Sequence, residues 1–247
     1  MSLNEDHISG RESVPVQDLN GSFSLNKEVD HEKELALVRR IEALNVYDSE
    51  RLNLLMVWRG IVPTANFIIT TQNPPLSEEE QDTLYQKAEA LFADLDLKFK
   101  EKTDYPGHEH GKRFYQVAQT EEILNEFIHI DFSDRKNSER IGLMFGIPLT
   151  AAHAYAQGPQ FLIRDEDIPL KIRSQDYMAF SKFWFSREHW QDELATVKNW
   201  AEQIRNIDPK LYERLVDYHK VLPFPLFKMG RIKTEEVPHA PHLKYIT

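Results

Sequence analysis

Two histidines at positions 108 and 110 form the sharpest cluster of side chains that could do chemistry. His108 and His110 flank Glu109, so both imidazoles point to one side if the segment is extended. Imidazole is a common ligand for zinc-type ions, and a catalytic zinc needs three protein ligands. A third ligand could come from nearby side chains, namely Asp104, Glu109, His129 or Asp131. The cluster is therefore compatible with a metal-assisted hydrolase, whereas its flanking glycines and proline favour a plain polar hairpin loop.

His129 and Asp131 form a second pair with the same spacing. On a strand the two side chains would share a face, and an imidazole beside a carboxylate can act as an acid–base pair. The alternative is an ordinary hydrogen-bonded contact at the surface. The sequence leaves both interpretations open.

A group of cations stands where a helix is predicted to begin, at Arg135, Lys136 and Arg140. A helix N-terminus with flanking cations can bind a small anion or a phosphate. Asp134 and Glu139 oppose such binding, and no glycine lets the backbone close around a phosphate. A small-anion-binding regulatory module is therefore an alternative function, and a solvated helix cap is the simpler interpretation.

The composition narrows the class of protein. The chain has 247 residues, of which 41% are hydrophobic and 11% aromatic, and this is enough apolar material for a core. Lys and Arg number 30 and Asp and Glu number 40, so the formal net charge is −10. That charge disfavours binding to nucleic acid or to an anionic membrane. The sequence has no cysteine, which excludes disulfides and thiolate chemistry.

Targeting and cofactor signals are also missing from the sequence. The first ten residues are polar and acidic, and no stretch approaches the ~20 apolar residues that a membrane helix needs. Glycine motifs for dinucleotides or phosphates are not found, nor is a nucleophile elbow. We therefore expect a cytoplasmic protein without a resident cofactor, with a divalent metal at the histidine cluster as the exception left open.

The first half of the chain predicts a small sheet with crossing helices. Apolar residues at helical spacing predict helices from about residue 30 and after residue 48. Residues 67–71, 95–99 and 113–117 are predicted strands, and the last two form a hairpin. Ser77 and Glu80 form a capping box that opens a helix between the first two strands, and Thr120 caps another. Residues 128–132 are either a fourth strand or the exit of that helix.

The second half of the chain predicts helices. Two short ones are expected at 138–145 and 149–157, then one at 174–185 and a long one from Ser186 to about residue 206. Asp208 and Pro209 open the last helix. The aromatic stretch from Tyr177 to Trp190 cannot point entirely inward from a helix, so some rings must meet another element, a partner or a ligand. The alternative is a large core under a helical lid.

The order β-α-β-β-α, with or without a final β, is typical of a split βαβ, or ferredoxin-like, unit. We therefore predict an α+β fold in which a small antiparallel or mixed sheet of this type carries an appended helical half. The expected organisation is an irregular arm at 1–29, a single α+β domain at 30–222 and an extended C-terminal arm at 223–247. Within the domain, the sheet region covers 60–132 and the helical region covers 133–222. The residues do not decide whether 1–29 are ordered.

One segment resembles a known type of sequence. Residues 140–148 read Arg-Ile-Gly-Leu-Met-Phe-Gly-Ile-Pro, and Ser186, Trp190 and Glu193 lie further along the chain. This pattern resembles the "Leu-Leu-Gly-Tyr-Pro" helix-turn-helix of conserved bacterial proteins of unknown function, in which a "Ser…Trp…Glu" helix follows. Ile147 stands where tyrosine is usual. The resemblance implies one integrated fold with a structural turn at 146–148, and it carries no activity, cofactor or catalytic residue.

These features lead to one leading hypothesis of function and two alternatives. The leading hypothesis is a non-enzymatic binding or assembly protein, which uses an aromatic-rich helical surface and the C-terminal arm to hold a protein partner or a second copy. The alternatives are the metal-assisted hydrolase at His108 and His110 and the small-anion-binding module. Whether the chain is an enzyme is not decided by its residues.

Overall fold

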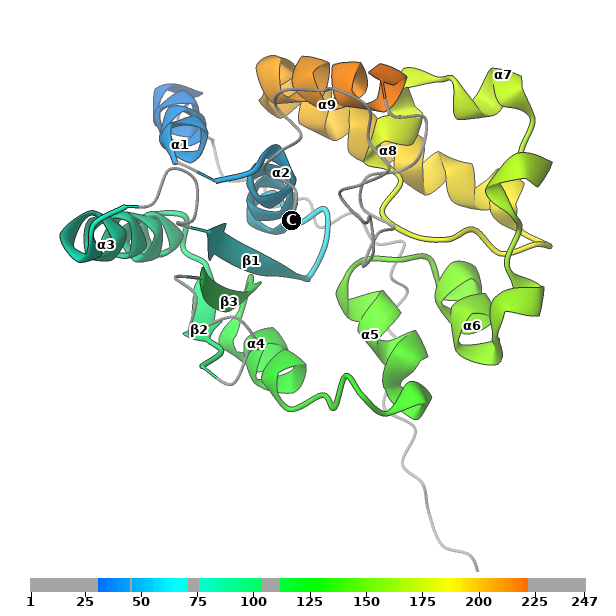
Figure 1. The fold of residues 1–247 in the computed structure, drawn as a ribbon, viewed down its shortest axis with the longest axis horizontal. Coiled ribbons are helices and arrows are strands. Elements are labelled where there is room, and N and C mark those ends of the chain that lie inside the picture. The colour runs from blue at the N-terminus through cyan, green and yellow to red at the C-terminus, as the bar shows by residue number, and fades with distance from the viewer. Residues whose placement is uncertain (1–30, 45, 71–75, 104–111, 222–247) are drawn as a thin grey trace, which may run out of the picture.

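A computed structural model of the chain describes residues 31–44, 46–70, 76–103 and 112–221 (Figure 1). Within these residues the protein is a mixed α and β structure that is mostly helical and contains a three-stranded antiparallel sheet. The predicted arms at 1–29 and 223–247 lie outside the described residues, and the domain boundaries stay predictions. Among the described helices, none is both long and apolar enough to cross a membrane.

The sheet and its helices come from the first half of the chain. In order, the elements are α1 (His31–Ala43), α2 (Asp48–Trp58), β1 (Thr64–Thr70), α3 (Glu78–Asp94), β2 (Lys98–Glu101), β3 (Lys112–Ala118) and α4 (Glu121–Ile128). The strand order is β1-β3-β2, and β3 pairs antiparallel with both neighbours. It follows that β1 and β2 run parallel to each other, with β3 between them and α3 in the connection. The outer side of β1 is an edge of the sheet among the described strands.

Local signals in the sequence placed several of these elements correctly. The capping box at the start of α3 is present, since Ser77 N donates to Glu80 Oε2 at 2.8 Å and Glu80 N donates to Ser77 Oγ at 3.3 Å. Thr120 caps α4 through the amide of Ile123 at 3.3 Å. The strand predicted at 95–99 instead begins at residue 98, because the turn after α3 places Asp96 at a φ of +55°.

The alternative of a fourth strand at 128–132 is wrong. Helix α4 continues to Ile128, and His129 closes it as the C-cap. The edge of β1 where a fourth strand could have been added is next to α2, which packs directly on β1. Two polar side chains of α2, Asn53 and Glu50, hydrogen-bond backbone groups along this edge of β1. The strand therefore has hydrogen-bond partners there although no further strand lies beside it among the described residues.

The second half of the chain is helical and packs beside the sheet (Figure 1). Its helices are α5 (Ser138–Met144), α6 (Leu149–Gln157), α7 (Leu170–Arg173), α8 (Trp190–Ile207) and α9 (Pro209–Val221). Asp208 caps α9 as expected, because its Oδ1 accepts from Leu211 N at 3.0 Å. Helix α2 contacts β1 on one side and α8 and α9 on another, which explains why almost every apolar residue of α2 is buried. One apolar cluster thus extends from Val38 on α1 to Val216 on α9.

The helix predicted at 174–185 is wrong. Only a 3₁₀ turn forms there (Asp176–Phe180), and residues 181–186 then run without a helix. A turn at 187–189 follows, and α8 begins at Trp190, four residues later than predicted. An isolated antiparallel bridge joins Leu162 to Ser186. An extended chain sends successive side chains to opposite sides, so this correction changes which aromatic rings face the core.

Candidate functional site

The metal site predicted from the histidine and acidic residues falls mainly outside the described residues. His108, His110, Asp104 and Glu109 lie outside the described residues, so that site stays a prediction. His129 is bonded to its own helix, with Nδ1 donating to the carbonyl of Asn125 at 2.6 Å. Among the residues that the structure describes, no three His, Asp or Glu side chains are grouped as a metal site requires.

Asp131 is engaged in its own turn and does not face His129 as an acid–base partner. Its Oδ1 accepts from the hydroxyl of Ser133 at 2.6 Å and from the amide of Ser133 at 2.9 Å. These hydrogen bonds stabilise the charged carboxylate and lower the pKa of Asp131. The pair predicted from the spacing of His129 and Asp131 is therefore two separate local contacts.

Of the three cations predicted to attract an anion, Arg140 is used in a contact within the chain. Arg140 Nε donates to Glu126 Oε1 at 2.9 Å, which ties α5 to α4. Asp134 Oδ1 accepts from the amide of Lys136 at 3.0 Å and so caps the turn itself. The anion-binding hypothesis stays a prediction without a contact in its favour.

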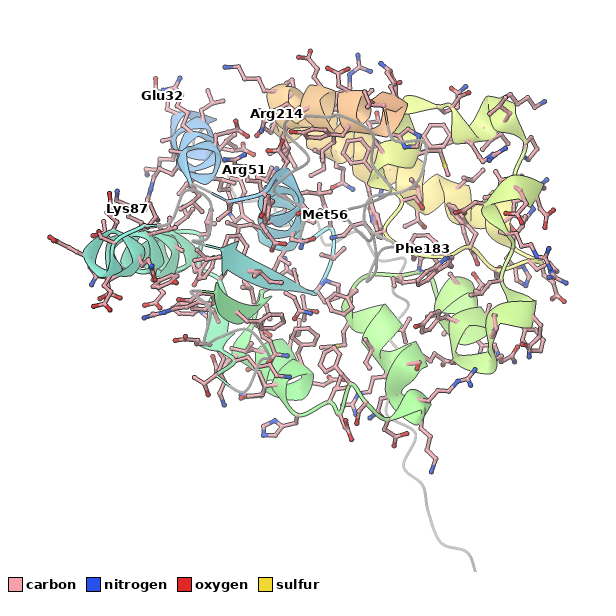
Figure 2. All side chains as sticks on the ribbon, in the orientation of Figure 1. Glu32, Arg51, Met56, Lys87, Phe183 and Arg214 are labelled. Atoms are coloured by element: carbon pink, nitrogen blue, oxygen red, sulfur yellow. The ribbon has the colours of Figure 1, made fainter. Side chains whose placement is uncertain are left out.

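The aromatic stretch does form a surface, by way of the extended chain at 181–186. Phe183 and Phe185 turn inward and are buried. Phe183, which is labelled in Figure 2, packs edge-on against Trp200 of α8 at 5.7 Å between ring centroids. Trp184, between them, turns outward and is 39% exposed. This alternation follows from the period of two in an extended chain. The rings of this stretch therefore divide between the core and the surface.

Trp184 lies on Tyr155, which projects from α6. The two rings are stacked, with centroids 5.7 Å apart and planes inclined by 12°. Tyr155 is 49% exposed, so both rings are partly open to solvent although they are in contact with each other. We call Tyr155 and Trp184 the aromatic pair. Sequence reasoning pointed to the stretch that contains Trp184 but missed Tyr155, which lies alone among small residues of α6.

A buried glutamate, Glu193, joins the elements that carry the aromatic pair. Glu193 of α8 is only 2% exposed. Its Oε1 accepts from the hydroxyl of Thr150 on α6 at 2.6 Å, and its Oε2 accepts from the amide of Ser186 at 2.8 Å. One side chain thus ties α6, α8 and the 181–186 chain together. Both donors to this buried side chain therefore belong to the elements that carry the two rings.

A polar cluster that includes Lys182 holds the edge of the sheet. Lys182 Nζ donates to Asn53 Oδ1, and Asn53 Nδ2 donates to the carbonyl of Asn66 on β1 at 3.1 Å. Glu50 lies one turn earlier on α2, and its Oε2 accepts from the amide of Ile68 at 2.9 Å. The amide and the carbonyl in question are on the side of β1 that faces away from β3, so these side chains take the place of a neighbouring strand.

Burial shifts the pKa values of both charged members of this cluster toward neutrality. Burial raises the pKa of Glu50 to about 7, and the bond from Ile68 and the charge of Lys182 only partly oppose that rise. Burial lowers the pKa of Lys182 to about 8, against the attraction of Glu50. Such a pair could exchange a proton near neutral pH. Its hydrogen bonds are, however, directed at β1 and at Asn53, which makes support of the sheet edge its evident task.

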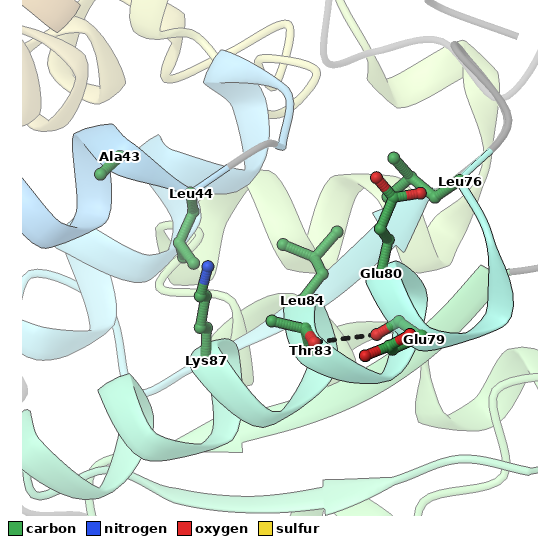
Figure 3. A pocket seen from close by; sticks show the side chains of 8 residues that line it. All are labelled: Ala43, Leu44, Leu76, Glu79, Glu80, Thr83, Leu84 and Lys87. Carbon is green, nitrogen blue, oxygen red and sulfur yellow. Dashed lines mark hydrogen bonds between the residues drawn. The ribbon is translucent and has the colours of Figure 1, made fainter.

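A groove lies between the end of α1 and α3 (Figure 3). Its volume is about 340 Å³, and its lining is made of Ala43, Leu44, Leu76, Glu79, Glu80, Thr83, Leu84 and Lys87. Glu80 is taken up by the capping box, and Thr83 Oγ1 donates to the carbonyl of Glu79 at 2.8 Å. Because these polar groups are bonded within α3, little in the groove selects one ligand over another.

No protein-family model matches the chain, and neither the curated proteins nor the solved structures contain a match to it.

Proposed function

We propose that this chain is a non-enzymatic binding or assembly protein and that the aromatic pair is its contact surface. The observation that carries the proposal is that Tyr155 and Trp184 are stacked and partly exposed, on elements that the buried Glu193 side chain joins. Tyr and Trp are the residues that most often dominate binding energy at interfaces. Rings that are already in place lose little conformational freedom on binding, which favours affinity.

The surrounding exposure supports this choice of surface. Several large apolar side chains of the helical half are exposed, and they include Leu149, Phe161 and Leu170 besides the aromatic pair. The pair is distinguished from these by the stacking of its two rings. We propose a protein partner or a second copy of the chain as the binding species, and the cytoplasm as its location, in keeping with a sequence without cysteine.

The sheet supports a finer proposal about the fold. We propose that β1, α3, β2, β3 and α4 form a split βαβ unit of the ferredoxin-like kind with one strand fewer among the described residues. The order β1-β3-β2, with β3 antiparallel to two parallel strands, supports this. The resemblance of residues 140–148 to the bacterial helix-turn-helix also stays a proposal, and the adjacent helices α5 and α6 are in accord with it.

The proposal is tested by removing the rings without removing their supports. Wild-type protein, Tyr155→Ala/Trp184→Ala and a control, Leu170→Ala, are applied to an array of peptides and glycans, and their self-association is measured by sedimentation velocity. Leu170 is 70% exposed and lies on α7, so it controls for loss of exposed apolar surface. We expect a ligand or a self-association that the double variant loses and the control retains. Identical behaviour of all three proteins in both assays would refute the proposed surface.

A further inference from the structure

A group of charged side chains joins α1 and α2 to α9. Its members are Glu42 on α1, Asp48 and Arg51 on α2, and Asp208 and Arg214 at the start and within α9; Arg51 and Arg214 are labelled in Figure 2. The guanidinium of Arg214 donates to Glu42 at 2.7 and 3.2 Å and to Asp48 at 2.9 and 3.0 Å. Arg51 donates to Asp48 at 2.6 Å. Because two-pronged bonds of this kind fix geometry, the carboxyl of Glu42 has a defined place beside α9.

One oxygen of Asp208 has no donor within the part of the chain that the structure describes. Asp208 is only 3% exposed, and its Oδ1 accepts from the amide of Leu211. Its Oδ2 is buried as well, but no described group donates to it. The carboxyl of Glu42 is in hydrogen-bonding contact with the carboxyl of Asp208. Two carboxylates offer only acceptors, so this contact is a hydrogen bond only when one of them holds a proton.

The charge of the group leads to the same conclusion. Two arginines and three carboxylates give 2 − 3 = −1, and one added proton makes the group neutral, which lowers the cost of burying it. Burial raises the pKa of Asp208, and Glu42 raises it further, against the bond from Leu211 and the charge of Arg214. Burial also acts to raise the pKa of Glu42, but Arg214, Asp208 and Arg51 outweigh it and lower that pKa. The proton is therefore held by Asp208 and donated to Glu42.

We propose that Asp208 and Glu42 share one proton, and that this hydrogen bond is a pH-sensitive clasp that fastens the end of α1 to the start of α9. A carboxylic acid that donates to a carboxylate makes a strong, charge-assisted hydrogen bond. When the proton leaves, two carboxylates face each other and repel, and α1 loosens. Ala43 at the end of α1 and Leu44 after it line the groove against α3, so the clasp also affects the shape of that groove.

The two carboxyls set the pH range of the clasp. The pKa of Asp208 is raised above 3.8, so the stability from this group is fully present below pH 3.8 and is lost as the pH rises through the folded-state pKa. The pKa of Glu42 is lowered below 4.5, so its contribution is present above pH 4.5 and is lost as the pH falls through its folded-state pKa. Interacting carboxyls titrate in two common steps, and the clasp holds between the lower step and the upper step.

Asp208→Asn is the variant that replaces the shared proton with a permanent donor. Asparagine keeps an oxygen for the amide of Leu211 and caps a helix as well as aspartate does, and its side-chain N–H can donate to Glu42 at every pH. Asp192→Asn is the matched control, because Asp192 is exposed in the first turn of α8 and the same charge is removed. The pKa of Glu50 is raised to about 7, but Glu50 is present in all three proteins, so a comparison among them cancels its effect.

Two measurements on the full chain test the clasp. Carbon-13 NMR follows the side-chain carboxyl carbons of Asp208 and Glu42 as the pH is raised, and hydrogen exchange follows the protection of the α1 amides. We expect both carbons of the wild type to report two common steps, and Glu42 to titrate in a single step in Asp208→Asn. Across the upper step, the protection of α1 should fall about tenfold more in the wild type and in Asp192→Asn than in Asp208→Asn.

Three results would contradict the clasp. If Asp208 and Glu42 each ionise at or below their ordinary values of 3.8 and 4.5, no proton is shared and the inference is wrong. Two common steps without a change in α1 protection would show that a shared proton does not fasten the helix. An equal fall of protection in all three proteins would likewise assign the pH dependence to another group.

Discussion

Glu50 gives the structure an unusual dependence of stability on pH. The pKa of Glu50 is raised by burial from an ordinary value of 4.5 to about 7. The folded state therefore holds a proton at pH values where the unfolded chain has lost it. The stability from this difference is fully present below pH 4.5 and is lost as the pH rises through 7. At about 1.4 kcal/mol per pKa unit, the free energy of unfolding should fall by about 2 kcal/mol between pH 4.5 and pH 6.5 from this group alone.

Glu50→Gln is the perturbation that isolates this effect. Glutamine keeps an oxygen that can accept from the amide of Ile68, but it cannot ionise. Lys182 does not obscure the result. Its pKa is lowered from 10.5 to about 8, so its contribution to stability is present above 10.5 and lost as the pH falls through 8. Below pH 6.5, Lys182 remains charged in both the folded and the unfolded state.

The assay is urea unfolding followed by circular dichroism at pH 4.5, 5.5 and 6.5. We expect the stability of the wild type relative to Glu50→Gln to fall by about 2 kcal/mol over this range. Glu202→Gln is the matched control, because Glu202 is exposed on α8 and its replacement removes the same charge. A difference between wild type and Glu50→Gln that stays flat or rises with pH would show that burial does not hold the proton on Glu50.

Three further predictions concern other parts of the chain. Glu193→Ala leaves the hydroxyl of Thr150 and the amide of Ser186 without their acceptor, so we expect urea unfolding to show a loss of about 3 kcal/mol. Gly146→Ala should lower the melting temperature in calorimetry, with a loss of about 2 kcal/mol or more. Its φ is +71° and an added Cβ would lie 2.6 Å from a methyl carbon of Val62; unchanged stability would contradict this turn geometry. If His108 and His110 bind zinc, zinc at 100 times its dissociation constant should raise the melting temperature of the tag-free protein by roughly 5–11 °C. Replacing both histidines by alanine should remove that gain. A wild-type protein that gains nothing from zinc would end the metal hypothesis.

Features of the structure that depend on neighbouring residues could be predicted from the sequence. Ser77 and Glu80 are three residues apart and satisfy each other's backbone amides, so the start of α3 needs no distant contact. Asp208 before Pro209 caps α9 for the same reason. The three strands were also predicted, because β-branched and aromatic residues with period two identify a half-buried strand.

Features that depend on distant contacts could not be predicted. The aromatic stretch near Trp184 is compatible with a helix by composition, and it runs extended because Ser186 bridges to Leu162 and Phe183 packs on Trp200. Lys182 donates a hydrogen bond to Asn53, which lies 129 positions earlier in the sequence. Glu50 and Asn53 lie one turn apart on a helix that is largely buried, and this signal could have pointed to the cluster, although not to its partner.

The binding surface was predicted in outline only. Aromatic excess indicated that some ring of the stretch must meet a partner, but the choice of Trp184 follows from the extended backbone and not from the sequence. The contact of Tyr155 with Trp184 depends on the packing of α6 beside the 181–186 chain, which the sequence does not predict. The structure therefore identifies one ring of the aromatic stretch, Trp184, and stacks it on Tyr155 of α6 with a defined geometry.

The most direct measurement compares the binding of wild-type protein and Tyr155→Ala/Trp184→Ala across the peptide and glycan array, after circular dichroism has shown that both are folded. Because both rings are partly exposed, we expect the double variant to keep its fold and to lose the ligands that the wild type holds. A folded double variant that binds the same ligands with the same affinities would contradict the assignment of the aromatic pair as the binding surface.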